Sequence, residues 1–190
     1  FTMTAGVPSW TGGTPPPPPP PTVTSSTGKV WMDRNLGASQ VATSSTDVDS
    51  YGDLYQWGRA SDGHEKRESA VTNGPVDFGS EGGNFIIQSN TYDWISTSDN
   101  TLWQLGNQDP CPTGFRVPTQ SELEAEVSNF SSLNRDAAFA SPLKLPAGGM
   151  RDGGGGGVYD RGAQGYYWSS TIYNNVNAYY LVFHSNGALM

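Results

Sequence analysis

The sequence predicts one domain of mixed α and β structure behind an extended N-terminal segment. The stretch 165–183, GYYWSSTIYNNVNAYYLVF, has two strand-like halves around a polar turn rich in Tyr and Asn. Thr119 followed by Glu122 forms a capping box, which marks the start of a helix. Gly, Ser, Thr and Asn are abundant elsewhere, and these residues favour turns and long loops.

The composition limits the class of protein. The chain has 190 residues, which suits one domain with a tail. Only 15% of them are charged, and with so many turn formers this favours an extracellular or virion protein. The net charge of −8 and ten scattered Lys and Arg argue against a nucleic-acid partner. No apolar run approaches the ~20 residues of a membrane span.

Cys111 is the single cysteine of the chain. One thiol excludes an internal disulfide framework and a zinc site built on cysteines. We expect a small, half-buried apolar side chain there. An intermolecular disulfide is the alternative, and a catalytic thiol is the least favoured interpretation.

Residues 1–14 form a short arm whose apolar residues alternate with small or polar ones, as in a strand. The arm is too short to bury itself. Pairing with a neighbouring subunit by strand addition is our preferred interpretation, with docking on its own sheet or disorder as alternatives. The candidate assembly residues are Phe1, Met3, Ala5, Val7 and Trp10.

A linker is predicted over 15–27, because Pro15 to Pro21 are seven consecutive prolines. Such a run adopts polyproline II and spans ~22 Å as a semi-rigid rod. It is interpreted as a spacer, with a ligand for a proline-binding module as the alternative. Thr14, Thr22 and Thr24 flank the run as candidate O-glycosylation sites, and the globular domain is expected to cover 28–190.

The first half of the domain is predicted to be loop-rich. Alternation at 30–33 predicts a strand that ends near Asn35 and Gly37. Asp49 or Ser50 is expected to cap a short helix that Gly58 ends, with Leu54 and Trp57 on its core face. Residues 59–110 are predicted to be mostly irregular, apart from short apolar runs at 85–87 and 103–105.

Five aspartates in these loops are candidate calcium ligands. They do not have EF-hand spacing, and aspartates in loops usually form turns. No cofactor is therefore expected, and calcium is kept as an open alternative. The aspartates are Asp62, Asp77, Asp93, Asp99 and Asp109.

The second half begins with the clearest helix. It is predicted from Thr119 to about Asn129, with Leu123, Val127 and Phe130 on one face, and Asn129 is a candidate N-glycosylation site. A strand is expected from 143, followed by a turn. The five glycines 153–157 lack the Lys-Ser/Thr of a P-loop and are interpreted as a flexible surface loop.

In the last strands, Tyr179, Leu181 and Phe183 alternate with Tyr180, Val182 and His184, so one set should face the core. Trp168 is interpreted as a core anchor. Tyr and Asn suit recognition surfaces, because Tyr brings contact area at low entropy cost and Asn brings adaptable hydrogen bonds. The candidate ligand-binding residues are Tyr159, Tyr173, Asn174, Asn175, Asn177, Tyr180 and His184.

Six motifs resemble, in order, those of the Fibrobacter succinogenes major paralogous domain family. They are GKVWMDRNLGA (28–38), YGDLYQWG (51–58), CPTGFRVPT (111–119), LPAGGMRD (145–152), GYYWSST (165–171) and NAYYLVF (177–183). The resemblance covers about 28–190 and implies a C-type-lectin-like α+β fold with a small mixed sheet, two helices and long loops. That scaffold is also similar to formylglycine-generating-enzyme-like domains and to the variable proteins of diversity-generating retroelements.

The chain departs from these relatives in its chemistry. The EPN, QPD and WND motifs of calcium-dependent lectins are absent, and so are the paired cysteines of formylglycine-generating enzymes. The two histidines, His64 and His184, do not lie in a metal-binding or catalytic motif. A protein without enzymatic activity is therefore expected.

These observations together predict an extracellular surface or fibre protein. It assembles with copies of itself through its arm and displays a lectin-like domain. The alternative is a phage tail-fibre or cell-surface adhesin module that recognises glycan or protein through 153–186.

Overall fold

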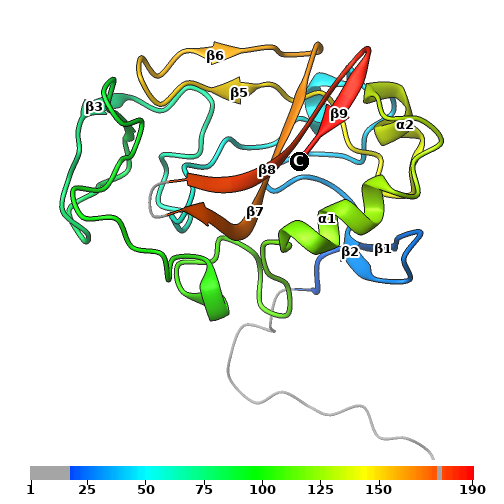
Figure 1. Cartoon of the computed structure of the whole chain (residues 1–190), viewed down its shortest axis with the longest axis horizontal. Coiled ribbons are helices and arrows are strands. Elements are labelled where there is room, and N and C mark those ends of the chain that lie inside the picture. Colours follow the sequence, from blue (N-terminus) through cyan, green and yellow to red (C-terminus); the bar gives the residue numbers. More distant parts are fainter. Residues whose placement is uncertain (1–17, 175–176) are drawn as a thin grey trace, which may run out of the picture.

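The structure, a computed structural model, describes residues 18–174 and 177–190. In these ranges the chain forms two α-helices and four small β-sheets, joined by long loops (Figure 1). The predicted α+β class with two helices is confirmed. The β structure differs from one small mixed sheet, because it is divided into three antiparallel sheets and one parallel pair.

The domain begins earlier than the sequence predicted. Strand β1 (Thr22–Thr24) pairs antiparallel with β2 (Val30–Met32). In the turn between them, the hydroxyls of Ser25 and Thr27 donate to the buried carboxylate of Glu126, at 2.6 and 2.5 Å. A buried carboxylate needs such donors. The predicted linker boundary at residue 27 is therefore wrong, since 22–27 belong to the domain.

The main core lies between the two helices and the sheet that ends the chain. Helix α1 (Gln120–Val127) begins with the predicted capping box and ends two residues before Asn129. Helix α2 (Arg135–Ala140) is capped by the side chain of Asn134. Leu123 and Ala138 of these helices pack in one cluster with residues of the terminal sheet. This sheet comprises β7 (Gly165–Asn174), β8 (Asn177–His184) and β9 (Gly187–Leu189).

The helix expected before Gly58 is wrong. Only the 3₁₀ turn η1 (Val48–Ser50) forms, and Asp47 caps it. Gly52 follows with a φ of +68°, and a Cβ there would lie 2.4 Å from the carbonyl oxygen of Leu36. The left-handed residue ends any helix, and the chain then runs extended, with the amide of Leu54 donating to the carbonyl of Glu65.

A second core supports the irregular middle of the chain. Strands β3 (Val71–Asn73) and β4 (Phe85–Ile87) pair in parallel, and the 3₁₀ turn η2 is Gln104–Gly106. Ile86, Trp94, Ile95 and Leu102 form a buried cluster, with Trp57 packed against it. Leu54 is only half-buried. The largely irregular structure predicted for 59–110 is confirmed.

The glycine-rich segment closes a hairpin between β5 (Met150–Arg151) and β6 (Val158–Tyr159). The strand expected from 143 is wrong, since Lys144 has a φ of +52° and the strand begins only at Met150. The loop is also not a free surface loop. The carboxylate of Asp152 accepts from the Gly155 amide at 2.6 Å, and the carbonyl of Gly153 accepts from the Gln88 amide at 2.7 Å. In the described ranges, the structure has no helix long and apolar enough to cross a membrane.

Candidate ligand-binding site

The antiparallel ribbon of β7 and β8 has two faces of different character. Tyr167 pairs with Leu181, and Gly165 pairs with Phe183, so these residues share a face. Leu181 and Phe183 are fully buried, and the ring of Tyr167 stacks on that of Phe183 at 5.6 Å. The predicted alternation along β8 is confirmed, and this inner face belongs to the main core.

The outer face of the ribbon is aromatic. Trp168 pairs with Tyr180 across the strands, and their rings meet edge to face at 5.5 Å. Tyr166, two residues before Trp168, lies 6.1 Å from the Tyr180 ring. Trp168 is 37% exposed and Tyr180 is 41% exposed. The prediction that Trp168 is a core anchor is therefore wrong, because the strand register directs its ring outward.

Hydrogen bonds hold these rings in place. The indole nitrogen of Trp168 donates to the carbonyl of Tyr55 at 3.0 Å. The hydroxyl of Tyr166 donates to the carboxylate of Asp160 at 3.1 Å, and burial together with this carboxylate raises the pKa of Tyr166 to about 12. The hydroxyl thus stays protonated. A ligand would meet a surface that is already ordered, which lowers the entropy cost of binding.

Tyr166, Trp168 and Tyr180 are among the residues that line a cavity with a volume of about 890 Å³, which also reaches residues of both cores, such as Leu102 and Leu123. We use the name aromatic groove for the part lined by Tyr55, Tyr92, Tyr166, Trp168 and Tyr180. Among the described residues, the hydroxyls of Tyr92 and Tyr180 have no hydrogen-bond partner. The groove therefore offers ring faces together with two hydroxyls that remain available to a ligand.

The predicted ligand-binding residues are only partly brought together. Asn174, Asn177 and Tyr180 line the groove. Tyr159 and Tyr173 are 55% and 64% exposed, but neither lines it.

The remaining predicted positions lie elsewhere. His184 lies at the turn into β9, where its Nδ1 accepts from the Asn186 amide at 3.2 Å. Asn175 lies outside the described residues.

Sequence reasoning missed Tyr55, Tyr92, Tyr166 and Trp168 as groove residues. Tyr166 and Trp168 are two residues apart along one strand, so their side chains lie on the same face. This spacing is visible in the sequence. Tyr55 and Tyr92 come from irregular loops, where no periodicity indicates which way a side chain points.

The other predicted sites are placed as follows. The assembly candidates Phe1, Met3, Ala5, Val7 and Trp10, and the glycosylation candidate Thr14, lie outside the described residues. Thr22 and Thr24 are exposed on β1. Asn129 is exposed, and its side-chain nitrogen donates to the Ala125 carbonyl at 2.8 Å.

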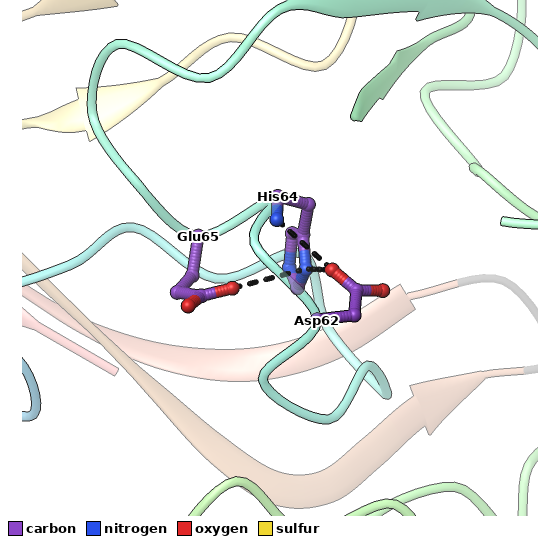
Figure 2. A group of neighbouring side chains, drawn as sticks. All are labelled: Asp62, His64 and Glu65. Atoms are coloured by element: carbon purple, nitrogen blue, oxygen red, sulfur yellow. Dashed lines mark hydrogen bonds and ion pairs between the residues drawn. The ribbon is translucent and has the colours of Figure 1, made fainter. Parts of the chain in front are cut away.

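One group of side chains in the described ranges has the composition of a metal site: Asp62, His64 and Glu65 (Figure 2). The imidazole Nε2 of His64 accepts from the Gln56 amide at 3.1 Å, so Nδ1 carries the proton and donates to Asp62 at 2.6 Å. The guanidinium of Arg59 donates to the second carboxylate oxygen of Asp62 at 2.6 Å. A cation would have to displace these bonds, so we assign the group a structural role.

Burial lowers the pKa of His64, and this keeps the imidazole neutral. Hydrogen bonds lower the pKa of Asp62 and Glu65 despite their desolvation. The group is thus a neutral histidine held between two carboxylates, which Figure 2 shows on two sides of the ring.

The loop aspartates act as turn formers. The carboxylates of Asp62, Asp93, Asp99 and Asp109 each accept from the backbone amide two residues further on. Asp77 accepts from the hydroxyl of Ser96 at 2.5 Å. The bonds of the first four aspartates confirm the turn-forming interpretation of the sequence.

Cys111 is half-buried, as expected. Burial and the neighbouring carboxylate of Asp109 raise the pKa of its thiol to about 12. Since the thiolate is the nucleophile, this shift lowers the reactivity of the cysteine at neutral pH.

Comparisons of the chain with family models, with curated proteins and with solved structures found no match.

Proposed function

We propose that this protein is an extracellular, non-enzymatic binding module of a surface or fibre protein. Its aromatic groove binds a glycan or a protein ligand. The outward aromatic face of the β7–β8 ribbon carries the proposal, because a folded domain rarely leaves Trp and Tyr exposed side by side without a partner. The lectin-like assignment of 28–190 is part of the proposal and rests on the six ordered motifs.

The chemistry of the described residues is consistent with binding rather than catalysis. The thiol of Cys111 is protonated, and both ring nitrogens of His64 are occupied by structural hydrogen bonds. Ser169 and Ser170 are buried in β7, and Ser169 donates to the Tyr179 carbonyl. The carboxylate of Asp109 raises the pKa of the Cys111 thiol and so opposes formation of a thiolate, and the hydroxyls of both serines donate to backbone carbonyls.

A glycan array and a panel of surface proteins, probed with and without EDTA, test the proposal. We expect saturable binding that EDTA does not reduce, because ring faces and hydroxyls carry it. The variant Tyr180→Ser should weaken that binding roughly tenfold. Tyr173→Ser is the matched control, since Tyr173 is more exposed but lies outside the groove. If no glycan and no protein gives binding above background, the binding role is refuted and only a structural role is left.

Assembly through the arm remains part of the proposal and has a separate test. Deleting residues 1–14 keeps the prolines and the whole described domain. If the shortened chain still forms the same assemblies in negative-stain images, docking of the arm is wrong.

A further inference from the structure

The described part of the proline run, Pro18–Pro21, precedes β1 and belongs to no helix or strand. Pro18 and Pro19 are exposed, and none of Pro18–Pro21 lines the aromatic groove. The carbonyl of Pro21 accepts from the Asp33 amide at 3.1 Å, which fixes the end of the run at β1. Because proline has no N–H, the rest of the run cannot extend the sheet. The apolar rings of Pro18 and Pro19 are therefore exposed beside β1 and belong to no sheet.

Polyproline II has a specific recognition chemistry. The helix has three residues per turn, no internal hydrogen bonds and carbonyls that point outward. Grooves that bind it supply aromatic walls for the proline rings and hydroxyl or indole donors for the carbonyls. Binding is helped because the proline helix is already rigid and loses little entropy.

The aromatic groove has both of these features. Trp168 and Tyr180 stand edge to face, so the ring faces form a stepped surface on which flat proline rings can pack. The hydroxyls of Tyr92 and Tyr180 lack partners among the described residues and are available to donate to carbonyls. The ring faces and hydroxyls of the groove do not need a charged ligand, and the proline run carries no charge.

We propose that the aromatic groove of one chain binds the polyproline run, Pro15–Pro21, of a second copy. This inference rests on the proposed function, because it uses the same aromatic face. The donor and the acceptor surfaces are different parts of the molecule, so the contact is heterologous. Repeated contacts of this kind give a filament, or a ring if the rotation closes.

The charge of the chain gives the contact a salt dependence. Each copy carries a net charge of −8, and the contact itself is uncharged. Repulsion between copies is screened over ~8 Å at physiological ionic strength. Added salt should therefore strengthen the association, whereas salt weakens a contact built on ion pairs.

The test is sedimentation of the full chain over a range of concentrations. We expect association that depends on concentration and that a free heptaproline peptide reverses. Replacing residues 15–20 with alternating Gly and Ser should weaken association at least about tenfold, as should Tyr180→Ser. Tyr173→Ser should associate as the parent does. Thermal melts verify that each variant is folded.

Several results would overturn the inference. One is a monomer at every concentration, with no saturable change in tryptophan fluorescence on adding heptaproline. Another is association that survives replacement of the prolines but is lost on deleting 1–14, which would assign assembly to the arm. If Tyr180→Ser abolishes binding of a glycan or protein and leaves assembly intact, the proposed function stands and this inference fails. If Tyr180→Ser changes neither ligand binding nor assembly, the proposed function and this inference both fail.

Discussion

Arg59 shows how one residue organises the irregular part of the chain. The residue is 2% exposed, and its guanidinium donates to four acceptors. These are the carboxylate of Asp62, the side-chain oxygen of Gln56, and the carbonyls of Gly82 and Asn84. The guanidinium also lies over the Trp94 ring at 5.4 Å. A planar group with a fixed fork of donors suits this arrangement, and a lysine does not.

Replacing Arg59 should therefore strongly destabilise the domain. Arg59→Met leaves the side-chain oxygen of Gln56 and the carbonyls of Gly82 and Asn84 without their donor, so the free energy of unfolding should fall by about 3–5 kcal/mol. Urea unfolding measures this change. Arg116→Gln is the matched control, because Arg116 pairs with Glu122 at an exposed site, where a loss below about 1 kcal/mol is expected. Equal losses in the two variants would contradict the structural role of Arg59.

At the scale of elements, the β5–β6 hairpin depends on its glycines for packing. Gly156 has a φ of +74°, and a Cβ there would lie 2.5 Å from Val71 Cγ1 and 3.1 Å from Ile87 Cγ2. The backbone thus lies directly against the parallel pair β3–β4. Arg151 strengthens the contact, since its guanidinium lies 4.2 Å from the Phe85 ring centroid.

Gly156→Ala should destabilise the protein by about 2–3 kcal/mol, from the left-handed backbone and from overpacking. Gly155→Ala is the control in the same loop, where a Cβ meets only the Asp152 carboxylate at 3.3 Å and no positive φ opposes it. There the loss of freedom in the unfolded chain should leave stability unchanged or slightly higher. Thermal unfolding of both variants measures the difference. If Gly156→Ala is as stable as the parent, the loop does not need this close approach.

The sequence predicted elements where local signals decide the structure. The capping box at Thr119 fixed the start of α1, and the alternation of Leu181 and Phe183 fixed the faces of β8. Predictions from the sequence failed where contacts between residues far apart in the chain decide the local structure. Gly52 blocks a helix because it packs against Leu36, a residue sixteen positions earlier.

The candidate site was predicted less well than the fold. Between Trp168 and Ile172 the register shifts, and buried Ser169 and Ser170 interrupt the alternation. The face of the β7–β8 ribbon on which the Trp168 ring lies therefore depends on its pairing with Tyr180. The sequence does not specify this pairing. The groove residues Tyr55 and Tyr92 are positioned by loop contacts, so they had no periodic signal at all.

At the scale of the whole molecule, polar groups join the two cores. The indole nitrogen of Trp57 donates to the Ser169 carbonyl at 2.9 Å and so ties the second core to β7. Gln56 bridges His64 to β4, because its side chain exchanges two hydrogen bonds with the Ile86 backbone. With little regular structure in the middle of the chain, the fold depends on His64 being neutral and on its carboxylate neighbours being charged.

This dependence predicts loss of stability in mild acid. The pKa of His64 is lowered in the fold, so below about 6.5 the unfolded chain takes up a proton that the folded chain does not. Stability should fall as pH drops, by at most about 1.4 kcal/mol per pH unit from this group. The lowered pKa of Asp62 and of Glu65 adds a further loss at lower pH, in the same direction. Urea unfolding from pH 7.5 to 4.5 measures the slope. His64→Gln cannot titrate, so its stability should change less between pH 6.5 and 5.5, and a parent curve that is flat over that interval would refute the role of His64.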